Sequence, residues 1–341
     1  MTSGQLHAFK LNNGTEIPSV GLGCYMGSND FTEKQVYSMV QKAIQAGYRH
    51  FDTATGYGNE KQVGEAIRDS GIARSEFYVT TKLANGDHHR VQEAFEESFE
   101  RLNLEWIDLY LLHWPQASTG DVDFSQINAP KMALPPDAHP TFVETYKEME
   151  KLMATGERKK KLLFLCGDRE QGRVKSIGVS NFSIKTLEEL LPHCSVVPAT
   201  NQVELHPCLP QDDLKSYCEA KGILLSAYSP LGRSQTFFAE QPLIAGLADK
   251  YHVTWAQIIL SWAVQRGTVV LPKSENEGRM IANITLLQLS DQDMHALNTL
   301  HRQPGMHRSL VPFHADYGGV FGWTYEWLGW KMAKGGYVLE V

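Results

Sequence analysis

The stretch His50-Phe51-Asp52-Thr53-Ala54-Thr55-Gly56-Tyr57-Gly58-Asn59-Glu60 places a carboxylate at the end of an apolar run and a tyrosine in the glycine-flanked turn that follows. Two later strand-like runs, 77–83 and 106–114, also carry a polar residue at or near their last position. Because the carboxyl ends of parallel strands meet at one edge of a sheet, we expect these side chains to converge in one site. The converging residues are Asp52, Tyr57, Lys82 and His113.

The chain as a whole alternates between strand-like and helix-like segments. Eight runs have the composition of strands: 19–23, 49–54, 77–83, 106–114, 174–181, 200–205, 223–229 and 269–274. Amphipathic stretches typical of helices accompany them: 33–46, 60–69, 91–102, 141–154, 184–191, 211–221, 254–265 and 276–284. The turn signal Asn12-Asn13-Gly14 predicts a hairpin over 9–18. Since parallel strands need long crossovers, we predict an α/β fold, a (β/α)8 TIM barrel with an N-terminal β-hairpin, as a single domain over 1–341.

An open doubly wound sheet is the main alternative to the barrel. Polar candidates lie at the carboxyl ends of seven of the predicted strands, and in an open sheet they would spread along a line. In a barrel they would surround a single ligand, which favours the barrel. These residues are Asp52, Lys82, His113, Asn181, Gln202, Tyr228 and Lys273.

Composition limits the classes of function. The 341 residues are 42% hydrophobic and 21% charged, as is usual for a globular protein. The formal charge is −7 without a long basic run, so nucleic acid is not an expected partner. No apolar run approaches the ~20 residues of a membrane span, and the N-terminus lacks a signal-peptide core, so we expect no membrane association. Five scattered cysteines without CxxC spacing indicate free thiols and a cytoplasmic protein, which we expect to be a monomer.

Three segments depart from the regular alternation. Residues 116–140 form a long polar loop after the fourth strand, on the side where barrels build active sites, and such loops are often lids. Residues 157–172 lie before the fifth strand, hence on the opposite side, and are either a surface insertion or a gene-prediction artefact such as a retained intron. Residues 302–341 form an aromatic tail, which is expected as a long C-terminal loop that either lines the substrate pocket or packs across the barrel mouth.

The converging residues suit the reduction of a carbonyl group, which needs a hydride at carbon and a proton at oxygen. A tyrosine hydroxyl can donate that proton, and a neighbouring cation lowers its pKa from about 10. Lys82 is the candidate cation, Asp52 would hold it in place, and His113 could orient the carbonyl or share the proton transfer. Taken singly, the four residues have structural explanations: a helix cap, a packing tyrosine, a solvated lysine and a core histidine. Their joint placement favours the chemistry.

Motifs along most of the chain resemble those of the aldo-keto reductases. They are Gly21-Leu22-Gly23, Phe51-Asp52-Thr53-Ala54, Tyr57-Gly58-Asn59-Glu60, Thr81-Lys82-Leu83, Leu111-Leu112-His113-Trp114-Pro115, Ile177-Gly178-Val179-Ser180-Asn181-Phe182, Asn201-Gln202-Val203-Glu204, Tyr228-Ser229-Pro230-Leu231-Gly232 and Leu271-Pro272-Lys273-Ser274. In that family the residues that match Asp52, Tyr57, Lys82 and His113 form the catalytic tetrad, with the tyrosine as general acid. The resemblance implies an aldehyde or ketone reductase that uses NADPH/NADP and no metal.

The resemblance also implies a nicotinamide site. Ser180, Asn181 and Gln202 would hydrogen-bond the carboxamide of the nicotinamide. Tyr228 would stack on its ring. The residues that would line the pyrophosphate are Ser229 and Leu231.

The adenosine half of the cofactor would lie at the strand-to-helix loop after the eighth strand. Such a loop offers backbone N–H groups to phosphate, and Lys273 and Arg279 add charge suited to the 2′-phosphate of NADP. The resemblance adds Ser274 and Asn283 to this group. One departure is Ala282, where many members of the family carry a glutamate beside the adenine-binding asparagine.

The remaining expectations concern the substrate pocket, a possible metal site and an alternative function. The resemblance places Tyr25 and Trp114 in the substrate pocket. The adjacent His88 and His89 lack further spaced ligands, so we expect a surface loop there and not a metal site. The alternative function is a nicotinamide-binding partner or regulatory protein, non-catalytic or weakly catalytic, on the same scaffold.

Overall fold

The computed structural model describes most of the chain. The described residues are 7–27, 32–120, 133–162, 172–233 and 237–339.

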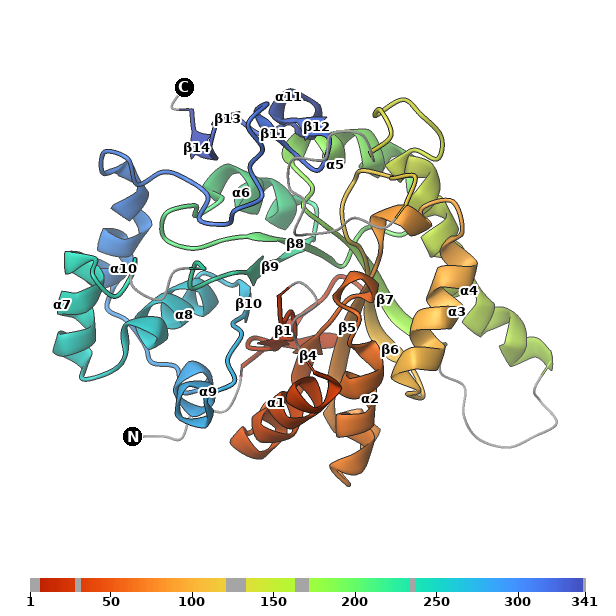
Figure 1. Ribbon diagram of the computed structural model, residues 1–341, viewed down its shortest axis with the longest axis horizontal. Coiled ribbons are helices and arrows are strands. Elements are labelled where there is room, and N and C mark those ends of the chain that lie inside the picture. Colours follow the sequence, from red (N-terminus) through yellow and green to blue (C-terminus); the bar gives the residue numbers. More distant parts are fainter. Residues whose placement is uncertain (1–6, 28–31, 121–132, 163–171, 234–236, 340–341) are drawn as a thin grey trace.

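Eight parallel strands form the centre of the molecule, hydrogen-bonded in sequence order from β3 to β10. They are β3 Leu22–Gly23, β4 His50–Asp52, β5 Tyr78–Leu83, β6 Ile107–Leu112, β7 Val174–Ser180, β8 Thr200–Glu204, β9 Leu224–Tyr228 and β10 Val269–Leu271. A parallel bridge between Val20 and Val270 joins the last strand to the first, and the Gly23 amide donates to the Pro272 carbonyl at 3.1 Å. The sheet therefore curls into a barrel surrounded by helices (Figure 1), and the predicted fold is confirmed.

Ten helices of seven or more residues follow or flank the strands in the described part of the chain. They are α1 Glu33–Ala46, α2 Glu60–Asp69, α3 Val91–Leu102, α4 Phe142–Leu162, α5 Ile184–Leu190, α6 Asp212–Ala220, α7 Pro242–Tyr251, α8 Trp255–Gln265, α9 Glu277–Ile284 and α10 Asp291–Asn298. Capping explains some of the boundaries: the Thr254 side chain accepts a hydrogen bond from the Gln257 amide, and Gln257 returns one to the Thr254 amide. The sequence did not predict α7 and α10.

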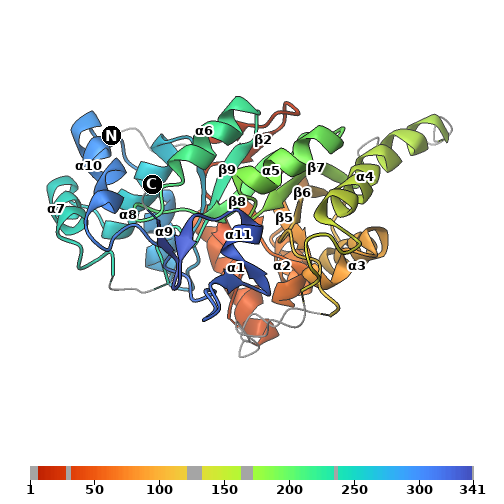
Figure 2. The same ribbon diagram turned by 90° about the horizontal axis from the view of Figure 1, so that it is seen from above.

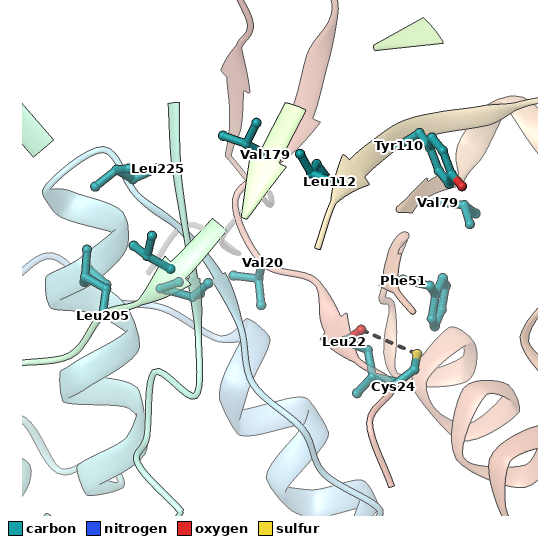
Figure 3. Packing of buried hydrophobic residues seen from close by; sticks show 14 of the residues in the cluster. Val20, Leu22, Cys24, Phe51, Val79, Tyr110, Leu112, Val179, Leu205 and Leu225 are labelled. Carbon is teal, nitrogen blue, oxygen red and sulfur yellow. Dashed lines mark hydrogen bonds between the residues drawn. The ribbon is translucent and has the colours of Figure 1, made fainter. Parts of the chain in front are cut away.

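Alternation along the strands separates two cores. Leu109 and Leu111 on β6 belong to a small interior cluster, whereas Tyr110 and Leu112 belong to the large cluster between the barrel and the helices. On neighbouring strands, Phe51 and Val79 lie in the same outer layer as Tyr110 (Figure 3). A residue two positions beyond an interior residue therefore points into the barrel.

The N-terminal hairpin supplies part of the interior core. Strands β1 Ala8–Lys10 and β2 Glu16–Pro18 pair antiparallel, which confirms the predicted hairpin. Leu11 and Ile17, from the turn and β2, pack in the interior cluster. That cluster also contains residues from β5, β6 and β10. The barrel interior is consequently apolar on the side of the hairpin, and the polar strand ends lie on the other side.

The C-terminal tail is more structured than the long loop that the sequence predicts. It contains short elements: β11 Gly319–Val320, β12 Trp323–Thr324, α11 Tyr325–Leu328, β13 Met332–Ala333 and β14 Tyr337–Val338. The Glu204 carboxylate at the end of β8 accepts hydrogen bonds from Ser309 at 2.5 Å and from the Leu310 amide at 2.7 Å. Figures 1 and 2 both place α11 beside α5, where Lys185 donates to the Glu326 carbonyl at 2.8 Å.

The flanks of the 116–140 loop contact this tail. Gln116 donates to the Val320 carbonyl at 2.9 Å, and the Trp323 indole donates to the Leu134 carbonyl at 2.7 Å. The centre of the loop, 121–132, lies outside the described residues. The described flanks of the 116–140 loop therefore lie against the C-terminal tail.

Helix α4 continues into the unusual 157–172 segment as far as Leu162. Its end projects away from the barrel in both views (Figures 1 and 2). Residues 163–171 lie outside the described part, and β7 begins at Val174. In the portion of the chain that the structure describes, no helix is long and apolar enough to cross a membrane.

Candidate active site

Asp52 and Lys82 form a buried ion pair at the carboxyl ends of β4 and β5. Both lie on the inward rows, because Lys82 is four residues beyond the interior Tyr78 on β5. The Lys82 ammonium is 2.5 Å from an Asp52 carboxylate oxygen and 2.8 Å from the Thr53 carbonyl. The Lys82 side chain has 0% exposure, so its charge has no access to bulk water.

A turn after β4 holds Tyr57 over this pair. The Tyr57 hydroxyl lies 3.5 Å from the Lys82 ammonium. Asn59 fixes the turn: it accepts from Thr53 at 2.6 Å and donates to the Cys24 carbonyl at 2.7 Å. The motif Tyr57-Gly58-Asn59-Glu60 did not indicate this role of Asn59. Because both ends of its amide are used, the turn is tied to β4 and to the end of β3.

Two aromatic rings, those of Tyr25 and His113, lie against the Tyr57 ring. The rings of Tyr25 and Tyr57 have centroids 5.0 Å apart. The His113 ring, which follows β6, lies 5.7 Å from the Tyr57 ring in an edge-on arrangement. The strand ends therefore bring together the four residues of the predicted convergence.

Burial sets the protonation states here. Burial lowers the pKa of Lys82, but the Asp52 charge and Tyr57 raise it by more, so that it lies above its ordinary value. Burial raises the pKa of Tyr57, and the Lys82 charge opposes this only in part. Burial, with Lys82 adding to it, holds the pKa of His113 well below its ordinary value. The expectation of a lowered tyrosine pKa is thus wrong for this structure, because desolvation outweighs the cation.

A second layer of amides surrounds the ion pair. Gln202 on β8 donates to the other Asp52 oxygen at 2.7 Å. Asn181 has a positive φ of 65°, a region that asparagine tolerates, and its amide donates to the His113 carbonyl at 3.0 Å. Tyr228 donates to the Asn181 side-chain oxygen at 2.8 Å. The hydrogen bond between Gln202 and Asp52 is a feature that no sequence motif indicated.

One cavity of about 710 Å³ contains these groups. It extends from Tyr57 to the first turns of α9. Of the sequence-predicted site residues, all except Lys82 line it, and Lys82 lies directly behind Asp52 and Tyr57. The lining residues from the prediction are Tyr25, Asp52, Tyr57, His113, Trp114, Ser180, Asn181, Gln202, Tyr228, Ser229, Leu231, Lys273, Ser274, Arg279 and Asn283.

The Aldo/keto reductase family model matches residues 19–302, which include every strand of the barrel. The chain belongs to the aldo/keto reductase family. Among similar proteins, glycerol 2-dehydrogenase (NADP(+)) of Saccharomyces cerevisiae is 39% identical, over 89% of this chain and 93% of that protein. Aldehyde reductase YPR1 of the same yeast is 38% identical, over 88% and 92%. A Bombyx mori aldo-keto reductase solved in complex with NADP superimposes with a TM-score of 0.72 at 33% identity, covering 87% of this chain and 93% of that one.

In this aldo/keto reductase the far end of the cavity is cationic and exposed. Lys273 and Arg279 are both exposed, whereas Ser274 and Asn283 are buried. The Lys273 ammonium forms an ion pair with Glu275. No sequence argument had singled out this glutamate, although it lies two positions from a predicted phosphate-binding lysine.

The near end of the cavity has an aromatic wall. Trp114 is 2% exposed, and its ring lies 4.9 Å from Phe321 and 6.3 Å from Phe313 of the tail. Its indole N–H has no hydrogen-bond partner among the described residues. The Trp114 ring therefore contributes an apolar surface to this end of the cavity.

The described residues contain no cluster of three or more histidine, cysteine or acidic side chains that could hold a metal ion. His88 is 2% exposed, which corrects the expectation of a surface loop there. The adjacent His89 is exposed, and polar residues flank the two histidines in sequence.

Proposed function

We propose that this protein is an NADP(H)-dependent oxidoreductase that reduces aldehydes or ketones to alcohols, with Tyr57 as the general acid. The observation that carries the proposal is the Tyr57 hydroxyl, which lines a large cavity 3.5 Å from a buried ammonium and beside a neutral imidazole. The names of the similar yeast proteins, a glycerol 2-dehydrogenase (NADP(+)) and an aldehyde reductase, agree with this class.

Tyr57, Lys82 and His113 have different roles in the proposed reaction. Tyr57 stays protonated near neutral pH, because burial raises its pKa, so it can donate a proton to the carbonyl oxygen. Lys82 carries a fixed positive charge behind the hydroxyl, which stabilises the phenolate that remains after donation. His113 is neutral and lies against the Tyr57 ring, where it would orient the carbonyl.

Asp52 acts on the reaction indirectly, by holding the Lys82 ammonium in place. Its carboxylate oxygens accept from Lys82 and from Gln202, so the ammonium has a defined position. An uncompensated ammonium at this depth would lose its proton. Asp52 is therefore a positioning residue in the proposed mechanism.

The donor set of the cavity fits a nicotinamide dinucleotide phosphate. The exposed Lys273 and Arg279 lie at the start of α9, where backbone N–H groups also favour phosphate. Buried amides of Asn181 and Gln202 face the same cavity near Tyr57 and suit a carboxamide. The bound cofactor would supply the hydride; Tyr228 would flank its ring, and Ser229, Leu231, Ser274 and Asn283 would line the remainder of its path.

The test of this proposal is Tyr57→Phe, which removes the hydroxyl and keeps the ring. General acid catalysis contributes typically ~10²–10⁴-fold, so kcat with a simple aldehyde should fall by that factor. NADPH affinity, measured by fluorescence titration, should stay unchanged. Tyr217→Phe on α6 is the matched control, since it removes a hydroxyl outside the cavity. Full turnover by the Tyr57 variant would remove that residue from the assigned role.

The same assay addresses the alternative of a non-catalytic nicotinamide-binding protein. Absence of NADPH oxidation with a panel of aldehydes and ketones, despite tight NADPH binding, would favour that alternative. The similar proteins reported above give it no support, because they are named as a dehydrogenase and reductases.

A further inference from the structure

Arg233 is a cation at the cavity that the carbonyl chemistry does not use. It follows β9 and lines the cavity together with Tyr25 and Phe313. Its guanidinium carbon lies 5.4 Å from the centre of the Tyr25 ring and 5.1 Å from that of Phe313. Contact with two aromatic faces orients a guanidinium while leaving its N–H edge available.

No carboxylate of the described residues forms an ion pair with Arg233. The ion pairs of the described residues include Lys82 with Asp52 and Lys273 with Glu275, but none that contains Arg233. The charge of Arg233 also acts on Tyr228: burial raises the pKa of Tyr228, and the Arg233 charge opposes that rise. Arg233 therefore adds a positive charge to the near half of the cavity from an exposed side chain.

Tyr25 connects this cation to the proposed proton donor. The Tyr25 ring has two such neighbours: the centre of the Tyr57 ring lies 5.0 Å from its centre, and the Arg233 guanidinium carbon lies 5.4 Å from its centre. A small substrate with its carbonyl oxygen at the Tyr57 hydroxyl would lie along Tyr25 with its remote end near the guanidinium.

We propose that Arg233 is a specificity-determining residue that binds an anionic group, such as a carboxylate, at the remote end of the carbonyl substrate. Guanidinium and carboxylate form paired, charge-assisted hydrogen bonds, which are stronger than neutral ones. The preferred substrates are then aldehydes or ketones that carry a carboxylate, such as oxo acids and sugar acids. This inference rests on the proposed reductase function and adds the substrate class.

A second possible anion is the pyrophosphate of the cofactor, since Ser229 and Leu231 lie in the same loop as Arg233. Two observations favour the substrate. The guanidinium contacts Phe313, which belongs to the aromatic wall around Trp114 at 6.3 Å. The other exposed cations of the cavity, Lys273 before α9 and Arg279 in it, lie at the end of the cavity proposed for the cofactor phosphates.

The experiment compares two substrates of nearly equal shape, 4-carboxybenzaldehyde and its uncharged methyl ester, with NADPH. The wild-type protein should have the higher kcat/KM for the acid. Arg233→Gln should lower the ratio of the two kcat/KM values by about ten- to a hundredfold, which is the range for a lost hydrogen bond to a charged group. Arg233→Lys should restore part of the ratio, because it keeps the charge without the fork.

Arg302→Gln is the control for net charge, because Arg302 is exposed and does not line the cavity. It should leave the ratio unchanged. NADPH affinity is measured by fluorescence for every variant. An unchanged ratio in Arg233→Gln overturns the inference. Equal losses on both substrates with weaker NADPH binding also overturn it and assign Arg233 to the cofactor.

Failure of the two proposals can be told apart. If the wild-type protein reduces neither aldehyde while it binds NADPH, the proposed reductase function fails. If it reduces the methyl ester well but does not favour the acid, only the role of Arg233 is wrong.

Discussion

Removing the Asp52 charge should expose the cost of keeping Lys82 buried. Asp52→Asn keeps the shape of the side chain and a hydrogen-bonding group for Gln202, but leaves a fully buried ammonium without its counter-charge. Breaking a buried pair by removing one partner costs about 3–5 kcal/mol. For a chain of this length the per-residue unfolding entropy converts that into a fall in Tm of about 4–7 °C.

The pH dependence of this loss has a definite sign. In the wild-type protein the folded pKa of Lys82 lies above its ordinary value, so its contribution is fully present at neutral pH and is lost only as pH rises through the folded pKa. In Asp52→Asn, burial is no longer opposed by the carboxylate, and the folded pKa falls below the unfolded one. The unfolded chain then binds more protons, so the variant gains stability as pH rises. The Tm difference from wild type should narrow between pH 7 and 9.

Thermal unfolding at several pH values measures this effect. Asp52→Asn combined with Lys82→Met should recover most of the lost Tm, because an apolar side chain replaces the buried charge. Glu148→Gln, which disrupts an exposed pair with Lys151, is the control and should change the Tm little. Equal Tm values for wild type and Asp52→Asn across this pH range would refute the reasoning.

Three further predictions concern the scaffold. Gly64→Ala on α2 should destabilise the protein by about 1–3 kcal/mol or more, because the added Cβ would lie 1.9 Å from the Leu102 carbonyl oxygen. Gly246→Ala on α7 should stabilise the protein by about 0.5–1 kcal/mol, because the added Cβ would have no atom within 4 Å. Burial lowers the pKa of His88 to about 3, so the unfolded chain binds an extra proton as pH falls below about 6.5, and stability is lost on acidification. His88→Met should therefore remove about 2 kcal/mol of the loss measured between pH 7 and 5. Deletion of 157–172 should leave kcat/KM within about twofold, since we propose that this segment is a surface insertion on the side opposite the cavity.

Each of these has a clear contrary result. Urea unfolding that ranks the two alanine variants equally would contradict the account of helix packing. A pH dependence of unfolding that His88→Met leaves unchanged would show that His88 is not a buried neutral imidazole. A deletion protein that folds normally yet loses its aldehyde reduction would assign the 157–172 segment to function.

The strands of the barrel were predictable because all are short apolar runs and seven of the eight carry a polar residue at or near the carboxyl end. Helix α7 was missed because its sequence, Pro242–Tyr251, is largely apolar on all sides and contains Gly246, so no polar stripe marks it. The short α10 carries too few turns for a clear period. Helix α4 runs beyond its predicted end, since the 157–172 segment begins with residues that favour helix.

The site was predictable in its members but not in its electrostatics. Positions at the strand ends follow from alternation, so the sequence could place Asp52 and Lys82 together. The pKa of Tyr57 depends on how much burial surrounds it, which no local pattern reports. Arg233 lies in a loop, and its direction depends on contacts with Tyr25 and with Phe313 of the distant tail.

The barrel separates stability from chemistry along its strands. On β5 the inward row passes from Tyr78 in the interior core, through Thr80, to Lys82 at the cavity. Extending the apolar row by one more inward position would replace the ion pair with packing, and such replacements are often neutral or stabilising. The fold could therefore accommodate apolar packing in place of this ion pair. We infer that the ion pair is retained for the proposed reaction and not for stability. The barrel can hold charges at its mouth because Leu11 and Ile17 of the N-terminal hairpin pack in the interior core at the opposite end.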